Sequence, residues 1–178
     1  DNLLCTGDPA SLSASINGNA PGPQYEWSGS ATGVLGNTAA NTFVHDPGES
    51  QDYTVEVTDL NNCTASDNIT ISLDPLPVLV NGIIAPSYCE SSLLSINTNQ
   101  LLTYNGNAVL NANWSMCGSN LPNNTLSISW IVANCGPLVP GTNTFDLEYT
   151  FTSPEQCTYT GSTTINVLAQ TFTNDIID

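Results

Sequence analysis

The chain has 178 residues, with sixteen Asp and Glu, one His and no Lys or Arg, and its formal net charge at pH 7 is −16. This length allows one or two domains. Without basic side chains the chain cannot displace counterions from nucleic acid or anionic lipid, so neither is an expected partner. Six cysteines with no CxxC pair favour disulfides over zinc binding and predict a location outside the cytoplasm. No apolar run is long enough to span a membrane.

The first 74 residues are predicted to form strands joined by turns. Alternating apolar residues and serines over 12–16 predict one strand, and Tyr25 and Trp27 begin another with both rings on one face. The Gly- and Ser-rich stretch 28–36 is expected to be a loop, and 42–44 a short strand.

The most regular stretch follows. Tyr53, Val55 and Val57 alternate with polar residues, which is the period of a strand with one buried face. Turn-forming residues occupy 59–62, and a second alternation covers 69–73. This predicts a hairpin with Cys63 at its return.

A second copy of this pattern begins after Asp74-Pro75-Leu76-Pro77. Strands are predicted at 78–80, 83–84, 94–96, 110–114 and 126–130, and a final hairpin at 145–151 and 163–168. Trp114 follows Cys89 at nearly the spacing that separates Trp27 from Cys5. We therefore predict a repeat domain at 1–74, a second at 75–170 with a cysteine-bearing insertion, and a linker or the start of another repeat at 171–178. No stretch shows helical periodicity, so the fold class is all-β.

The two copies differ at their edges. Residues 78–85 precede Cys89 in the second copy, whereas four residues precede Cys5 in the first. We hypothesise that the first unit lacks its first edge strand and that the tail at 171–178 begins the next unit. An exposed edge would pair with the tail of a neighbour.

The repeat favours one of the fifteen possible cysteine pairings. It predicts disulfides between Cys5 and Cys63, between Cys89 and Cys157, and between the inserted Cys117 and Cys135.

The sequence contains few residues that could act as catalytic groups. His45 is the single histidine, and its neighbour Asp46 would point to the opposite face of a strand. No nucleophile or metalloprotease motif is present, so we expect no enzymatic activity. His45 is expected to be a surface residue at a strand end.

Calcium is the most plausible ion, although no metal site is predicted. The candidate ligands are weak: Asp46, Glu49 and Asp52 precede the hairpin, and Asp59 lies in its turn with Asn61 and Asn62. These residue types are also ordinary turn formers, and solvated turns are the favoured interpretation. No cofactor is expected.

Three tryptophans are candidates for sugar stacking. Trp27 and Trp114 hold equivalent positions in the repeat, which favours a core role for both; Trp130 lies in the insertion.

The pattern Cys5…Tyr25-Glu-Trp27…Tyr53-Thr-Val-Glu-Val-Thr-Asp…Asn62-Cys63-Thr-Ala-Ser resembles the immunoglobulin-like and PKD-like repeats of giant surface adhesins. Such repeats are typical of Bacteroidota proteins secreted through the type IX system, including gliding-motility adhesins of the SprB type. Tyr53 resembles the corner tyrosine of these sandwiches, while Val55 stands where antibody domains have a core cysteine.

The resemblance implies two tandem immunoglobulin-like β-sandwiches in an extracellular, cell-surface filament with adhesion as its role. Neighbouring repeats of the same chain are the expected partners, and surface polysaccharide is a further candidate. The alternative is a carbohydrate-binding or accessory module of a secreted hydrolase.

Overall fold

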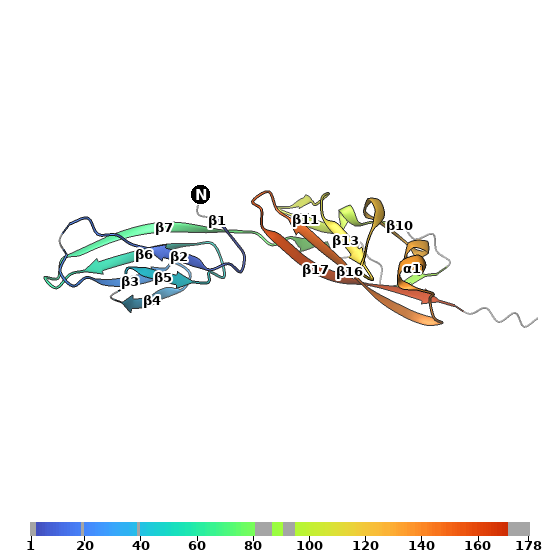
Figure 1. Cartoon of the computed structure of the whole chain (residues 1–178), viewed down its shortest axis with the longest axis horizontal. Helices are drawn as coiled ribbons and strands as arrows, with labels where there is room; N and C mark the ends of the chain where they lie inside the picture. Colours follow the sequence, from blue (N-terminus) through green and yellow to red (C-terminus); the bar gives the residue numbers. More distant parts are fainter. Residues whose placement is uncertain (1–2, 19, 39, 81–86, 91–94, 171–178) are drawn as a thin grey trace, which may run out of the picture. The chain divides into compact units, whose positions relative to one another are not determined.

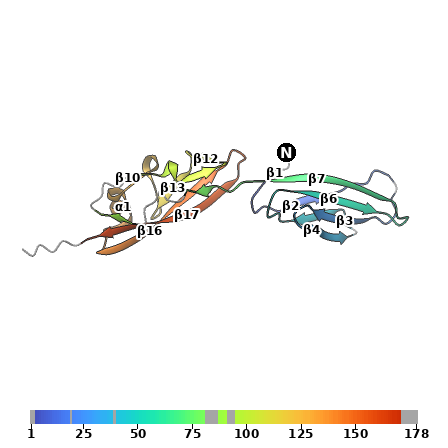
Figure 2. The ribbon, with the colours of Figure 1, turned by 180° about the vertical axis from the view of Figure 1, so that it is seen from behind.

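The computed structural model describes residues 3–18, 20–38, 40–80, 87–90 and 95–170. The chain divides into two compact units, Asp1–Pro75 and Leu76–Asp178, each with its own sheets (Figure 1). Figures 1 and 2 show each unit from opposite sides, with the last two strands of each unit forming a long hairpin.

The first unit contains two sheets. The larger has five strands in the order β1-β7-β6-β3-β4, and the smaller pairs β2 with β5. The strands are β1 (Leu3–Cys5), β2 (Ala10–Ser13), β3 (Gln24–Gly29), β4 (Gly33–Thr38), β5 (Thr42–His45), β6 (Gln51–Thr58) and β7 (Thr64–Asp74).

The core of the first unit forms where the alternating apolar residues of both sheets meet. Tyr25 and Trp27 of β3 are both buried, as the alternation predicts, and they pack with Tyr53 and Val55 of β6. Leu12 of β2 covers this cluster from the smaller sheet. The predicted hairpin is confirmed as β6 and β7, which pair antiparallel over their shared length.

The second unit has three sheets. Their orders are β14-β13-β16-β17-β9, β10-β15 and β12-β11-β8. The strands are β8 (Val78–Leu79), β9 (Tyr88–Cys89), β10 (Ser95–Asn97), β11 (Leu102–Tyr104), β12 (Asn107–Ala108), β13 (Asn113–Met116), β14 (Ser119–Asn120), β15 (Thr125–Ser127), β16 (Gly141–Thr152) and β17 (Thr158–Ala169). Two 3-10 turns, η1 (Thr98–Gln100) and η2 (Pro122–Asn124), and the helix α1 (Ile128–Cys135) complete it. The predicted strand at 83–84 lies outside the described residues.

The large sheets of the two units match strand for strand. Each ends in an antiparallel hairpin whose last strand carries a short strand running parallel to it, β1 on β7 and β9 on β17. The order of β7, β6, β3 and β4, opposed by β2 and β5, is the G-F-C-C′ and B-E arrangement of immunoglobulin-like sandwiches. The all-β, immunoglobulin-like fold class is therefore confirmed.

Residues 28–36 are a correction to the sequence prediction. They are not simply a loop, because β4 begins at Gly33 and pairs with β3. Gly33 has a φ of 73°, which lets the chain reverse tightly after Thr32. The strand was missed because its glycines break any apolar alternation.

The insertion of the second unit is the other correction. The predicted strand at 126–130 ends at Ser127, where α1 begins with the Ser127 side chain accepting the N–H of Trp130. Gly136, at a φ of 96°, ends the helix. Ile128 and the fully buried Ile131 have helical spacing, but the run Leu-Ser-Ile-Ser-Trp also alternates, so the sequence pattern fitted both structures.

Candidate functional site

The first candidate site is the parallel strand pair at the edge of the large sheet of each unit. In the first unit β1 runs parallel to β7, with Leu3 beside Ser72 and Cys5 beside Asp74. In the second unit β9 runs parallel to β17, with Tyr88 beside Val167 and Cys89 beside Leu168. Tension between the chain ends of the first unit therefore draws β1 and β7 past one another in opposite directions, whereas in the second unit β9 follows β8 and is not the first strand.

The register of these strands shows that Cys5 and Cys89 hold equivalent positions in the two units, as the repeat predicts. It also shows that two of the three predicted disulfides are wrong. Cys63 lies just before β7, whereas Cys5 lies beside the last residue of that eleven-residue strand. At about 3.3 Å per residue the two cysteines are about 35 Å apart, and a disulfide needs Cα atoms within about 7 Å. Cys63 is an exposed free thiol.

The same geometry excludes the predicted bond between Cys89 and Cys157. Cys89 lies beside Leu168, and Cys157 precedes the start of β17 at Thr158. The strand between them again spans about 35 Å. Cys5 and Cys157 are both disulfide-bonded, though neither is bonded to its predicted partner.

The inserted cysteines do form a disulfide. The Sγ atoms of Cys117 and Cys135 are 2.08 Å apart and their Cα atoms 5.4 Å apart. This bond ties the end of α1 to the β13–β14 turn.

Asp59 organises the tip of the β6–β7 hairpin. Its Oδ1 accepts the backbone N–H groups of Asn61 and Cys63, both at 2.8 Å. These hydrogen bonds, that of Cys63 first, lower the pKa of the Asp59 carboxyl below its usual value. The carboxylate therefore holds the turn by binding its backbone.

The other acidic calcium candidates do not join Asp59. Asp46 and Glu49 are exposed near the start of β6, and Asp52 accepts the hydroxyl hydrogen of Thr70 at 2.6 Å. Most of the eight-residue strand β6 separates this group from the tip. No group of three or more His, Cys, Asp and Glu side chains suited to a metal ion occurs among the described residues.

A side-chain network that sequence analysis missed surrounds Tyr53. The fully buried Tyr53 hydroxyl lies 2.7 Å from Nδ1 of His45 and accepts from Nε2 of Gln51 at 2.9 Å. Burial, chiefly, raises the pKa of Tyr53. His45 is half-buried instead of fully at the surface, and Tyr53 differs from a corner tyrosine because its hydroxyl bonds side chains. The apolar residue pattern carried no signal for these polar partners.

Two of the three tryptophans are core residues, as expected. Trp27 is 2% exposed and Trp114 1% exposed, and each stands at the same place in its sheet. The indole N–H of each is buried without a hydrogen-bond partner among the described residues. Trp130 is half-buried at an open depression beside Pro122 and Ser129.

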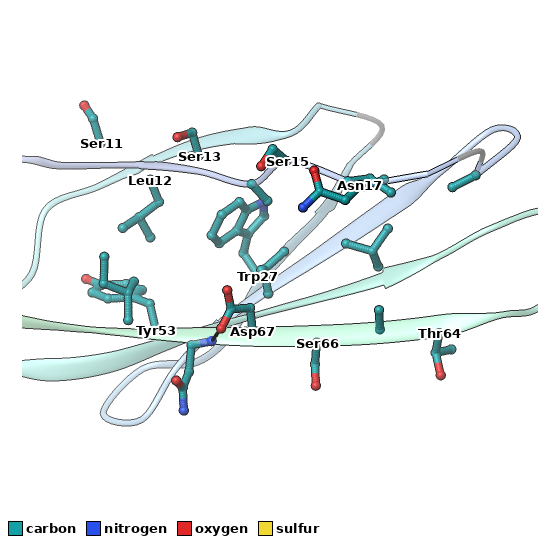
Figure 3. A pocket seen from close by; sticks show the side chains of 18 of the residues that line it. Ser11, Leu12, Ser13, Ser15, Asn17, Trp27, Tyr53, Thr64, Ser66 and Asp67 are labelled. Atoms are coloured by element: carbon teal, nitrogen blue, oxygen red, sulfur yellow. Dashed lines mark hydrogen bonds between the residues drawn. The ribbon is translucent and has the colours of Figure 1, made fainter.

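A large concave feature lies in the first unit, and we call it the β2–β7 groove. Its volume is about 940 Å³, and it lies between β2, with the residues that follow it, and the first half of β7 (Figure 3). Leu12 and Asp67 point into the gap from opposite walls, and Trp27 and Tyr53 lie between them. Ser66 and Thr64 point away on the other face of β7.

No helix among the described residues is long and apolar enough to span a membrane. None of the protein-family models matches this chain, and none of the curated proteins does.

Several solved structures are similar to this chain. The fibronectin(III)-like modules of CbhA from Clostridium thermocellum match at 10% identity and a TM-score of 0.38, covering 95% of this chain and 89% of that one. The insect immune protein hemolin matches at 14% identity and a TM-score of 0.42, covering 96% and 44%. A 1.5-MDa bacterial ice-binding adhesin matches at 14% identity and a TM-score of 0.32, covering 96% and 61%. This chain thus spans less than two thirds of the hemolin and adhesin chains, and the assignment of its fold rests on strand order.

Proposed function

We propose that this chain is a segment of immunoglobulin-like modules that bear tension in a secreted, adhesion-related surface protein. The supporting observation is the parallel pairing of β1 with β7 and of β9 with β17. Tension between the chain ends of the first unit loads all hydrogen bonds of the β1–β7 pair together, whereas a pair opened from one end loses its bonds singly.

The chemistry of the chain suits such a role better than catalysis. The sixteen carboxylates have no Lys or Arg partner, which keeps the surface acidic and soluble. The Cys117–Cys135 disulfide accords with an oxidising, extracellular location. We propose that the modules have no enzymatic activity.

The finer assignment rests on the sequence resemblance. The residues from Tyr53 to Cys63 resemble repeats of type IX-secreted surface adhesins of Bacteroidota, which would make gliding motility and surface polysaccharide relevant to the whole protein. The carbohydrate-binding alternative needs exposed aromatic side chains, and the burial of Trp27 and Trp114 leaves Trp130 as its one candidate among the three tryptophans.

The load-bearing role can be tested at Ser72. Ile71 pairs with Gln51, and the N–H of Leu73 is donated to Ser50 Oγ on the β6 side. The N–H of the exposed Ser72 therefore points toward β1. Ser72→Pro removes this donor, and Ser72→Ala keeps it as a matched control.

Single-molecule pulling of the reduced full chain gives the comparison. We expect Ser72→Pro to lower the force that unfolds the first unit, while Ser72→Ala unfolds at the wild-type force. Equal unfolding forces in all three chains, with Ser72→Pro less stable at equilibrium, would rule out the parallel pair as the load-bearing element.

A further inference from the structure

The first unit leaves part of its inner sheet face uncovered at the β2–β7 groove. Seven consecutive residues of β7, Thr64–Thr70, are exposed, although Ala65, Asp67 and Ile69 belong to the inward set that continues to the buried Ile71. Ile69 is 37% exposed. An inner sheet face with exposed apolar residues needs a covering element.

The second unit shows the covered form of the same face. By strand pairing, Ala65 corresponds to Tyr159 and Ile71 to Ile165, which are 8% and 0% exposed. Asp67 corresponds to Gly161, over which the ring of Tyr149 lies. Tyr104 of β11 also packs on Phe151 there, with ring centroids 5.3 Å apart.

The covered unit also has a strand that the described part of the first unit lacks. In the second unit β8 pairs antiparallel with β11, the strand that follows β10. The N–H of Val80 extends this pairing to the carbonyl of Leu101 at 2.9 Å. In the first unit β2 corresponds to β10, and the described residues of its sheet are β2 and β5 alone.

The edge of β2 that faces the groove is open for the same kind of pairing. Ala14 donates its N–H to Asn41 on the β5 side at 2.8 Å. The backbone groups of Ser13 and Ser15 therefore point the other way, toward the open edge. An open edge beside an uncovered apolar face is the arrangement that accepts an added strand.

We propose that the β2–β7 groove binds the C-terminal tail, residues 171–178, of a second copy as an added β-strand. Asp74 and Leu168 are counterparts, because each lies beside the cysteine of its parallel strand. Since β8 begins at Val78, four residues after Asp74, its counterpart in the tail begins at Phe172. The tail thus holds the sequence position of a β8 strand, and copies join head to tail.

The dimensions and composition of the tail fit this site. Eight extended residues span about 26 Å, close to the length of the exposed part of β7. Phe172 and Ile176 would share one face of the strand and supply apolar contact for Leu12 and Ile69. Each copy carries a charge of −16, so repulsion opposes the contact and added salt should strengthen it.

The test is sedimentation of the full chain over a range of concentrations, with disulfide-linked dimers excluded by a non-reducing gel of the same samples. We expect the average mass to rise with concentration, and to stay that of a monomer when residues 171–178 are deleted. Ala65→Tyr places in the groove the residue found at its counterpart and should abolish association. Ser66→Tyr changes the opposite face of β7 and should associate as the wild type does.

A peptide of residues 171–178 gives an independent measurement that needs no altered fold. Added to the tail-deleted chain, it should slow hydrogen exchange of the amides of Ser13 and Ser15, which face the open edge. A wild-type chain that stays monomeric at every concentration, or association that survives loss of the tail, would overturn the proposal. Association by Ala65→Tyr at wild-type strength would overturn the assignment of the groove.

Discussion

Replacing Tyr53 with phenylalanine should destabilise the first unit through one hydroxyl group. That hydroxyl accepts from Gln51 Nε2 at 2.9 Å and lies 2.7 Å from His45 Nδ1. Gln51 is 4% exposed, so its amide hydrogen would lose its partner in a site closed to water. Leaving a buried polar group unpaired costs about 1–3 kcal/mol. For a unit of this size that corresponds to a fall of about 5–20 °C in its unfolding midpoint.

The assay is hydrogen exchange of the slowest amides in β6, which report unfolding of the first unit separately from the second. Tyr149→Phe is the matched control, because no hydrogen bond of the Tyr149 hydroxyl is found among the described residues. Its effect is measured by hydrogen exchange of the slowest amides in β16. A Tyr53→Phe cost below about 0.5 kcal/mol, no larger than that of an ordinary surface substitution, would refute the argument.

The same residue makes a pH prediction. Burial raises the pKa of Tyr53 in the folded state, so the neutral phenol stabilises the unit at any pH below about 10. This contribution is lost as the pH rises through the raised pKa. Tyr53→Phe should remove that part of the alkaline loss of stability in β6, whereas Tyr149→Phe should leave it in place.

Four further predictions concern other parts of the chain. Maleimide should label Cys63 in the native protein and leave Cys117 unlabelled until the disulfide is reduced. Mass spectrometry measures the labelling, and a Cys63 that does not react would contradict its exposure at the tip of the β6–β7 hairpin. The Asp59 carboxylate stabilises the hairpin above the ordinary pKa of aspartate and loses this contribution as the pH falls through its lowered pKa, so Asp59→Asn should flatten the acid limb of a stability–pH curve. Gly161→Ala places a Cβ 2.7 Å from the ring of Tyr149 and should cost about 1–3 kcal/mol in urea unfolding; a neutral result would show that the ring moves freely. Calcium and chelator should give the same thermal midpoint, because the carboxylates at the two ends of β6 do not converge; a rise of many degrees with calcium would show a metal site.

The hairpins were predictable because their signal is local. Tyr53, Val55 and the alternating residues of β7 follow the period of a strand, and the structure pairs them as expected. The equivalence of Trp27 and Trp114 was predictable too, since a repeat preserves the spacing of its core residues.

The failures come from information that alternation does not carry. The edge strand β4 has glycines where a pattern needs side chains, and the run before Trp130 fits a strand and a helix equally well. The cysteine pairing failed for a different reason. The alignment matched Cys5 with Cys89 and Cys63 with Cys157, but only the parallel register showed that the two aligned cysteines of each unit lie at opposite ends of its last strand.

The candidate sites were partly foreseeable. The unequal edges of the two copies predicted that the first unit lacks an edge strand; in the structure β1 occupies the edge of the large sheet, and the described residues of the smaller sheet form β2 and β5. Gln51 lies two residues before Tyr53 on the same face of β6, but the bond to His45 was not foreseeable, because only the packing of the two sheets brings β5 to Tyr53.

The Cys117–Cys135 bond also limits how far the chain can lengthen when it is stretched. A fully extended polypeptide gains about 3.4 Å per residue, and the bond closes a loop with a sequence separation of 18. Breaking this bond alone would therefore let the second unit release about 60 Å more contour length. In a single-molecule pulling experiment the intact bond would give a smaller increase in length when the second unit unfolds. The redox state of this bond therefore limits the length of the unfolded unit.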